Sequence, residues 1–442
     1  MPRPLPKAPL RDLRLVVDYL RALRNEVAID EHIVAMAGLD PAAFGKIPRP
    51  SRWIGKARRY PVLSRLLQHV SLPIWYCLGS LLYERQCRQV LALKPAAALR
   101  RFDICGQILG LSQRCADIVH AQHLDPLPRQ WLELPWVPLR NLPPNAEVIP
   151  ALDLLGKADI ARSLALAKLA HRALQRRHDV RGWGLQTYTA WRWFVARLAV
   201  DKLPGPLLTV EHFDRWAVLV DGSVWRSQRQ QKARQLTVMQ HGSVNAEGPS
   251  PGLGLRLPTR LRAVSRLHVY SAADAEVFKR EILSARCARH GLEITFFRPT
   301  IPLRKLAMPG RPAILFIGHP LCEAAHCALM TTLHKAGDVQ AFYKPHPTAD
   351  AGAQVAKLPW TVVRGRTVFP RVDVIVSYPS TMVSEYAAHG IPAVVHRMDI
   401  APDKILERVP EVLQMIHARR ANVDAHVSLG IAETSTGYPQ QL

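Results

Sequence analysis

The stretch VQAFYKPHP at residues 339–347 decides the fold, and VDVIVSYPST at 372–381 repeats its pattern. Each begins as a short run rich in β-branched and aromatic residues, which is typical of a buried strand. Polar residues follow the first run at Lys344 and His346, and the second at Ser380. Because ligands of open α/β sheets bind at the carboxyl ends of parallel strands, we expect a site at this edge.

The residues at these strand ends suit a nucleotide with its phosphates and ribose. Ser380 and Thr381 lie at a predicted strand-to-helix turn, where backbone N–H groups favour an anion. Glu385, one turn later, could accept both ribose hydroxyls. An N-cap serine followed by a glutamate would explain the same pattern. The point charge of Lys344, and a His346 held between two prolines, favour the phosphate site over that alternative.

Strands and helices alternate along the chain from about residue 206. The pattern predicts one parallel sheet before a proline-rich break at 299–312 and a second sheet after it. A chain of 442 residues is long enough for two or three domains. We expect four regions: a helical N-terminal region at 1–122, a proline-rich connector at 123–150, a Rossmann-like domain at 151–300 and a second one at 301–442.

Polar residues after the predicted strands of the first sheet are candidate bases. Glu211 and His241 each follow a strand directly, and Asp214 lies in the next helical turn. A base must take the proton of an acceptor hydroxyl, or a carboxylate must attack the substrate itself. The sequence leaves Glu211 and His241 equally favoured. Asp214 could simply favour the helix dipole, and we expect Asp221, farther along the same helix, to be solvated.

In the second sheet, Gly318 and His319 end the first predicted strand. The glycine would let backbone approach a ligand that His319 contacts, although a plain turn explains both residues equally well. We find no Asp-x-Asp pair at a strand end and no His/Cys set with zinc spacing, so no metal is expected. The absence of GxGxxG and GxxxxGK[ST] motifs argues against dinucleotide enzymes and P-loop NTPases, and no resident cofactor is expected.

The charge of the chain is strongly positive. A formal net charge of +24 and a pI near 10.3 favour polyanionic partners such as nucleic acid, anionic lipid or phosphorylated substrates. No compact nucleic-acid-binding motif is present, so we expect no nucleic acid. An apolar segment at about 61–83 is interrupted by Arg65, His69 and Pro73 and is too short to span a bilayer. It is read as a core helix, with an interfacial segment as the alternative because arginines flank it.

The cysteines and the first residues of the chain indicate the cellular compartment of the protein. The seven cysteines include no C-x-x-C pair and are odd in number, which favours reduced thiols. The beginning, Met1-Pro2-Arg3-Pro4, has no apolar core of a signal peptide. We therefore expect a cytoplasmic protein, with peripheral attachment to the inner membrane as an alternative.

Several of these motifs together resemble a known family. Lys344-Pro345-His346-Pro347, the sequence SYPST at 377–381, Glu385 and then Gly390-Ile391-Pro392 are similar to the C-terminal domain of bacterial GT-B glycosyltransferases that build surface polysaccharide. The pattern is most similar to enzymes that use CMP-activated acid sugars, the sialyl-, polysialyl- and Kdo-transferases. It is also similar to the CDP-glycerol glycerophosphotransferases of wall teichoic acid. The resemblance covers roughly residues 206–420.

The resemblance implies roles for individual residues. It makes His346 the contact to the donor phosphate, Ser380 and Thr381 the hydroxyl pair on that phosphate, and Glu385 the acid on the nucleotide side. The sequence QHG at 240–242 resembles the acceptor-side loop of the same enzymes, with His241 as base or anchor. The chain lacks the clear double-acid-glycine motif of polysialyltransferases.

The implied fold is α/β and GT-B-like, with two Rossmann-like domains facing a cleft and a helical N-terminal extension. The implied activity is metal-independent transfer of a Kdo or sialic-acid type sugar from a CMP-linked donor to a capsule or lipopolysaccharide glycan, which could be lipid-linked. Two alternatives stay open: a CDP-glycerol or other alditol-phosphate transferase, and a non-catalytic basic scaffold that binds membrane or nucleic acid.

Overall fold

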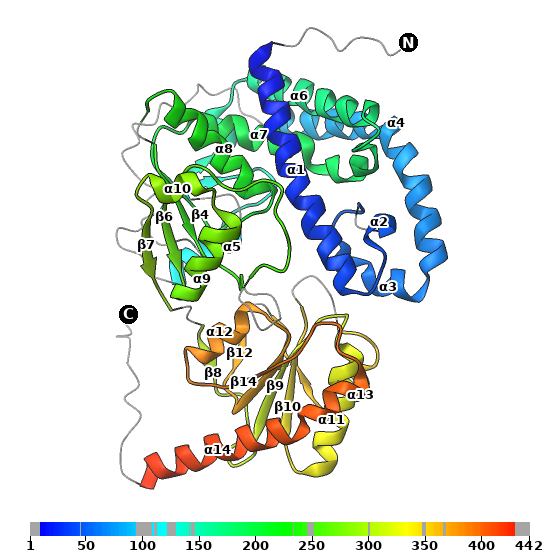
Figure 1. Cartoon of the computed structure of the whole chain (residues 1–442), viewed down its shortest axis with the longest axis vertical. Coiled ribbons are helices and arrows are strands. Elements are labelled where there is room, and N and C mark those ends of the chain that lie inside the picture. Colours follow the sequence, from blue (N-terminus) through cyan, green and yellow to red (C-terminus); the bar gives the residue numbers. More distant parts are fainter. Residues whose placement is uncertain are drawn as a thin grey trace. The chain divides into compact units, whose positions relative to one another are not determined.

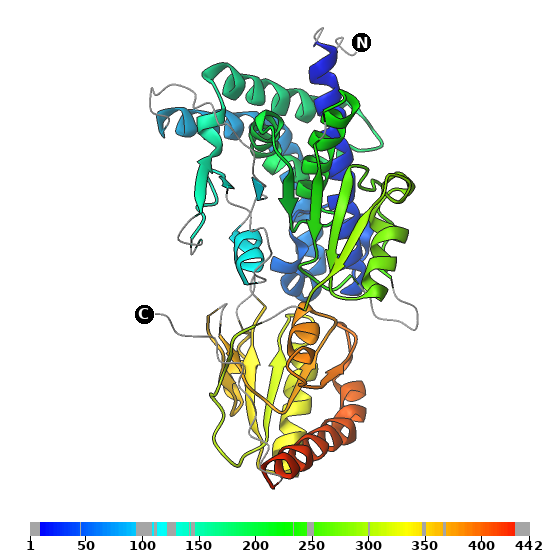
Figure 2. The ribbon, with the colours of Figure 1, turned by 90° about the vertical axis from the view of Figure 1, so that its left-hand side faces the viewer.

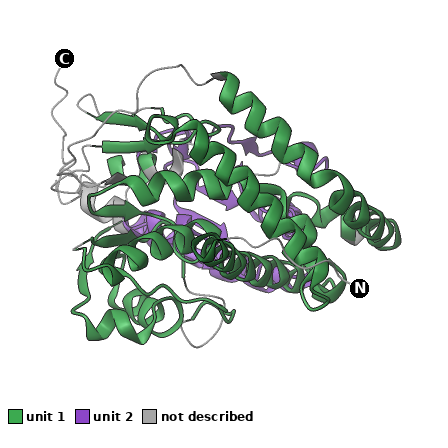
Figure 3. Cartoon of the chain, turned by 90° about the horizontal axis from the view of Figure 1, so that it is seen from above, with its two compact units in different colours: residues 1–300 green, residues 301–442 purple. Residues whose placement is uncertain are grey.

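The computed structural model describes most of the chain: residues 9–44, 46–93, 108–109, 113–121, 130–140, 142, 146–232, 234–244, 252–298, 301–346, 351–365 and 368–428. The chain divides into two compact units, residues 1–300 (unit 1) and 301–442 (unit 2), shown in different colours in Figure 3. Each unit is built on a parallel sheet with helices, so the protein is a mixed α/β structure (Figure 1). No helix among the described residues combines the length and the apolar character needed to cross a membrane.

Unit 1 contains a seven-stranded sheet in the order β3-β2-β1-β4-β5-β6-β7, and all its pairings are parallel. The chain builds outward from β1 in both directions, so the strand order reverses between β1 and β4. The strands are β1 Ile108–Leu109, β2 Gln130–Glu133, β3 Glu147–Pro150, β4 Leu207–Thr209, β5 Leu236–Met239, β6 Val264–Val269 and β7 Glu293–Phe296.

The prediction of an extended connector at 123–150 is wrong for its described part. Strands β2 and β3 lie in this region and join the sheet of unit 1. The prolines are accommodated because β3 is the edge strand and Pro150 ends it, where a missing N–H costs little. The region before it is also not a separate helical extension, since β1 lies there and pairs with β4.

The helices of unit 1 pack on its sheet and on one another. They are α1 Leu10–Met36, α2 Pro41–Phe44, α3 Ile54–Arg59, α4 Pro61–Leu93, α5 Gln113–Ala121, α6 Lys157–Arg176, α7 Ala190–Lys202, α8 Arg215–Arg229, α9 Ala272–Val277 and α10 Ala285–Arg289. Short 3-10 turns at Pro50–Arg52, Ala151–Leu154 and Arg181–Thr189 and a π turn at Phe278–Ile282 join them.

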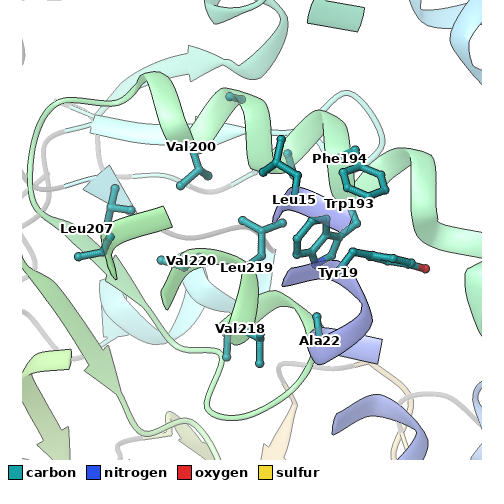
Figure 4. Packing of buried hydrophobic residues seen from close by; sticks show 14 of the residues in the cluster. Leu15, Tyr19, Ala22, Trp193, Phe194, Val200, Leu207, Val218, Leu219 and Val220 are labelled. Carbon is teal, nitrogen blue, oxygen red and sulfur yellow. The ribbon is translucent and has the colours of Figure 1, made fainter. Parts of the chain in front are cut away.

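The N-terminal helix α1 is part of the core of unit 1. Tyr19 lies with its ring centroid 5.2 Å from those of both Trp193 and Phe194 of α7. Leu15 and Leu219 complete the layer between α1, α7 and α8 (Figure 4). Such side chains contribute several kcal/mol each when fully buried, on the order of 3–5 for a large aromatic. The helix therefore belongs to the folded unit and is no appendage.

Unit 2 contains a five-stranded parallel sheet in the order β11-β10-β9-β13-β14. Its strands are β9 Ala313–Ile317, β10 Gln340–Lys344, β11 Thr361–Val362, β13 Val374–Ser377 and β14 Ala393–Val395, and a separate parallel pair joins β8 Leu303–Arg304 to β12 Phe369–Pro370. The predicted strands of this region agree within two residues. Figure 2 shows both sheets from a second direction.

Both faces of the unit 2 sheet are covered. Ile314 and Phe316 belong to one hydrophobic cluster, whereas Leu315 and Ile317 belong to another. Since alternate residues of a strand point to opposite faces, β9 is buried on both sides, as parallel sheets require. The helices are α11 Glu323–Ala336, α12 Thr381–Ala387, α13 Pro402–Ile405 and α14 Val409–Ser428, with 3-10 turns at Val355–Lys357 and Leu406–Arg408.

Candidate functional site

The strand order of unit 2 reverses between β9 and β13, and predicted site residues lie at that point. From β9 the chain builds β10 and β11 on one side and β13 and β14 on the other. The ring of His319, after β9, has its centroid 5.2 Å from that of His346, after β10, and 5.5 Å from that of Tyr378, after β13. The structure thus brings the ends of three adjacent strands together, where open α/β sheets bind ligands.

His319 is buried, and its protonation state follows from its contacts. Its Nδ1 accepts the backbone N–H of Leu321 at 3.2 Å, so the neutral ring carries its proton on Nε2. Burial, and the neighbouring His346, lower the pKa of His319 to about 4. Near neutral pH this side chain is therefore an uncharged hydrogen-bond donor.

Gly318 has a packing role. A Cβ at this position would lie 2.3 Å from the Cζ and hydroxyl oxygen of Tyr343. The close approach expected for a ligand is thus made by a protein side chain. Tyr343 extends past the glycine and donates from its hydroxyl to Glu323 Oε1 at 3.4 Å.

Lys344 lies inside the protein and is held by backbone. Its Nζ donates to the carbonyls of Gly365, at 2.9 Å, and Val368, at 2.8 Å, and lies 4.8 Å from the ring centroid of Phe369. Burial lowers the pKa of Lys344 to about 8, and the carboxylate of Glu385 acts in the opposite direction. Two of its three donors are therefore directed at loop carbonyls, and its charge is balanced in part by Glu385.

The remaining predicted donor-side residues belong to α12. Ser380 is its N-cap, and its Oγ accepts the N–H of Met382 at 3.2 Å, which is the capping alternative weighed from the sequence. Thr381 is the first residue of this seven-residue helix, and Glu385, half-buried, interacts with Lys344. Among the residues that the structure describes, only the Met382 N–H bonds to the Ser380 hydroxyl, which has a proton and a second lone pair besides.

In unit 1 the ends of β4 and β5 are joined through two histidines. The His241 ring centroid lies 4.2 Å from that of His212, and the His241 backbone N–H donates to His212 Nε2 at 2.8 Å. His241 Nδ1 contacts the carbonyl oxygen of Val210, so its proton sits on Nδ1 and its basic lone pair on Nε2. His212 was not among the predicted site residues, although it directly follows Glu211.

Carboxylates crowd the start of α8. Asp214 is the N-cap of α8 and accepts the N–H groups of Trp216 and Ala217 at 2.9 and 2.8 Å. Burial, followed by the neighbouring Glu211 and Glu26, raises the pKa of Asp214 well above its usual range. Glu26 comes from α1, so only the fold reveals its contribution.

A buried arginine anchors this region. Arg215 forms an ion pair with Glu26, Nε to Oε2 at 3.2 Å, and its guanidinium donates to the carbonyl and the side chain of Gln186 at 3.0 and 2.8 Å. Gln186 in turn donates to Asp30 of α1. Burial, and then Glu26, raise the pKa of Asp30 to about 7. This network ties α1 to α8 and holds the Glu26 carboxylate near Asp214.

The expectation that Asp221 is solvated is wrong. Its side chain is fully buried and accepts the backbone N–H groups of Arg262 and Ala263 at 2.5 and 2.7 Å. Two backbone donors and the Arg262 guanidinium compensate its burial, so Asp221 holds the chain before β6 in place.

Three buried side chains of unit 2 form a group that was not predicted from the sequence. Cys322, His326 and His396 offer ligand atoms within 4.8 Å of one another and could hold a metal ion. Hydrogen bonds also explain why these three polar side chains are buried together. His396 Nδ1 donates to the carbonyl of Arg397 at 2.8 Å, so its Nε2 accepts from His326 Nε2, also at 2.8 Å. The Cys-x-x-x-His spacing was a visible signal, since it places two ligands one helical turn apart.

Neither a protein-family model nor a curated protein sequence matches the chain. Among solved structures, the chain is similar to a GtfA/B complex, with 10% identity and a TM-score of 0.30 over 51% of this chain and 56% of that one. It is also similar to α,α-trehalose 6-phosphate synthase from Burkholderia multivorans, with 10% identity and a TM-score of 0.35 over 73% and 98% of the two chains. The chain thus spans little more than half of the first structure, and similarity at this level carries no argument about function.

Proposed function

We propose that the protein is a GT-B-type glycosyltransferase that moves a Kdo or sialic-acid type sugar from a CMP-linked donor to a capsule or lipopolysaccharide glycan. One observation carries the proposal: His319, His346 and Tyr378 meet where the strand order of the unit 2 sheet reverses. Two imidazoles and a phenol at such a point suit a nucleotide phosphate.

On the donor side, the histidines act on the phosphate. His319, uncharged near neutral pH, donates a hydrogen bond from Nε2 to a phosphate oxygen. His346 donates a proton or hydrogen bond to the oxygen that leaves the anomeric carbon. Lys344 and the net positive charge of the chain favour the anion without requiring direct contact. Ser380, Thr381 and Glu385 are assigned to the phosphate and ribose, as the sequence motifs imply.

On the acceptor side, unit 1 supplies the base. His241 is favoured because the Val210 carbonyl orients its ring and leaves the lone pair on Nε2, the arrangement of an oriented general base. Glu211 is the alternative. The acceptor oxygen attacks the anomeric carbon, its proton passes to the base, and the bond from that carbon to the phosphate oxygen breaks with its electron pair on CMP. No metal is assigned a part in this step.

The test uses the full chain and a panel of nucleotide sugars. We expect CMP to raise the melting temperature and CMP-linked Kdo or sialic acid to release CMP when a glycan acceptor is added. UDP-glucose is the matched control donor and should release no nucleotide. Release from CDP-glycerol alone would replace the proposal by an alditol-phosphate transferase. The proposal would be overturned if CMP did not bind and no donor released its nucleotide.

A further inference from the structure

Helix α4 is apolar on two sides, and one side is anchored to unit 1. Tyr83 and Tyr76 are buried, and the Tyr83 hydroxyl donates to the carbonyl of Thr187 at 2.7 Å. Trp75 Nε1 donates to Thr187 Oγ1 at 2.8 Å. Figure 1 shows α4 in light blue at the margin of unit 1. These contacts fix which side of the helix faces outward.

The outward side, which we name the α4 face, is a continuous apolar stripe. Its residues recur every three or four positions, so they line one side of the helix over roughly 27 Å. Each is between 50% and 80% exposed: Val62, Leu63, Leu66, Leu67, Val70, Ile74, Leu78 and Leu81. A helix that is apolar all round is normally covered on every side, and large exposed apolar patches mark interaction surfaces.

The charges around the α4 face have one sign. Residues 61–83 contain no Asp or Glu, whereas Arg65, near the start of α4, is exposed and lies over the Phe44 ring. Lys56 and Arg59 precede it, and Arg85 and Arg88 follow it, all exposed. The first acid after the stripe, Glu84, forms an ion pair with Lys168. The face is thus apolar along its length and basic at both ends.

We propose that the α4 face docks the protein on a membrane surface rich in anionic phospholipid. The helix would lie in the plane of the interface, with its apolar stripe at the acyl boundary and its arginines at the lipid phosphates. Charge complementarity selects this occupant. A second copy of the chain would bring like-charged arginines together with no carboxylate of the stripe to pair them, which is costly. The proposal is independent of the transferase activity.

Vesicle flotation of the full chain tests the proposal. We expect the protein to float with vesicles of phosphatidylcholine mixed with phosphatidylglycerol, and much less with phosphatidylcholine alone. The triple variant Leu66→Glu, Ile74→Glu and Leu78→Glu should lose this binding, because it places carboxylates in the apolar stripe. The matched control, Leu306→Glu, Met308→Glu and Leu406→Glu, alters exposed apolar residues elsewhere and should float like the unaltered protein.

Two further measurements keep the result decisive. Circular dichroism should show the same helix content for both variants, since all altered side chains are exposed. Light scattering without lipid should give the same mass for the unaltered protein and the triple variant. Failure to float with anionic vesicles would overturn the proposal. So would a dimer that the α4-face variant converts to a monomer, because the face would then join two copies of the chain.

Discussion

The two sheets gather different side chains at the carboxyl ends of their strands: carboxylates with histidines in unit 1, and histidines with a lysine in unit 2. In unit 1 the residues after β4 bring Glu211 and Asp214 beside Glu26 of α1. In unit 2 the strand ends bring together His319 and His346, with Lys344 at the end of β10. The unit 1 edge therefore combines carboxylates with the imidazoles of His212 and His241, whereas the unit 2 edge gathers histidines and a lysine.

Burial acts on both edges, but with opposite results. It raises the pKa of Asp214 and lowers those of His319 and Lys344, because desolvation always disfavours the charged form. In unit 1 the carboxyl group of Asp214 therefore keeps its proton to a higher pH than an exposed aspartate, because its pKa is raised. In unit 2 the uncharged donor of His319 lies at the same edge as Lys344, which is still a cation near neutral pH, and both favour an anion. Under the proposed function, the phosphate belongs to unit 2 and the acceptor hydroxyl to unit 1.

The largest effect is expected at unit 2. His346→Ala should reduce nucleotide release by about 10²–10⁴-fold, because it removes the group that protonates or binds the leaving phosphate oxygen. CMP binding, measured by calorimetry, should weaken as well. His334→Ala is the matched control, since His334 is an exposed histidine of α11 and should leave both measurements unchanged. Full activity of the His346 variant would show that the donor phosphate does not bind at this edge.

A smaller loss is expected at unit 1, with a different signature. His241→Ala should lower turnover by about 10²-fold and leave CMP affinity unchanged, because the base acts on the acceptor and not on the nucleotide. Glu211→Gln separates the two candidate bases by the same turnover assay. If either variant weakened CMP binding as strongly as it slowed turnover, the division of tasks between the two units would be wrong.

Acid should destabilise unit 2. Burial lowers the pKa of His319 from 6.5 to about 4, and burial lowers those of His326 and His396 in the same direction. Such histidines bind protons more readily when unfolded, so stability is lost as pH falls from about 6.5 toward 4. The full shift of His319 corresponds to about 3 kcal/mol of unfolding free energy. The raised pKa of Glu323 opposes this loss only in part.

Unit 1 has opposing groups over the same pH range. His171 and His268 act like the histidines of unit 2, since burial lowers their pKa values. The pKa values of Asp30 and Asp214 are raised, so these groups bind protons more readily in the folded state. Their protonation therefore stabilises the fold as pH falls. Peptide-resolved hydrogen exchange should therefore show unit 2 losing protection first on acidification. Loss from unit 1 first would contradict these assignments.

The smallest effect concerns packing beneath the unit 2 edge. Gly318→Ala places a Cβ against the Tyr343 ring and should lower the unfolding free energy by about 1–3 kcal/mol. Gly337→Ala is the control, because nothing lies within 4 Å of a Cβ there. Denaturant unfolding measures both. Equal stability of the two variants would show that Tyr343 moves aside easily and leave Gly318 open to a ligand role.

The strands of unit 2 could be predicted because their signals are local. A run such as AILFI at 313–317 is short, apolar and rich in strand-forming residues, so it appears as β9 almost residue for residue. The same holds for the positions of His319 and His346 at strand ends. Local pattern therefore placed these residues at the carboxyl ends of adjacent strands, as the structure has them.

Other features depend on distant parts of the chain and were missed or misjudged. Prolines at 123–150 indicated a connector, yet strand β3 tolerates Pro150 because it lies at the sheet edge. Asp221 looked solvated, but the segment before β6 covers it and donates to it. Glu26 and Asp30 reach the site from α1. No pattern within a short window carries such information.

The place of α1 in the core has a consequence for biosynthesis. Asn25 donates to the carbonyls of Phe213 and Thr259, which lie 188 and 234 residues later in the chain. During synthesis the first helix therefore emerges from the ribosome long before its packing partners. Until they follow, its apolar side, with Tyr19 and Leu23, stays exposed to solvent. We expect the nascent chain to depend on chaperones until α8 and the segment before β6 have emerged.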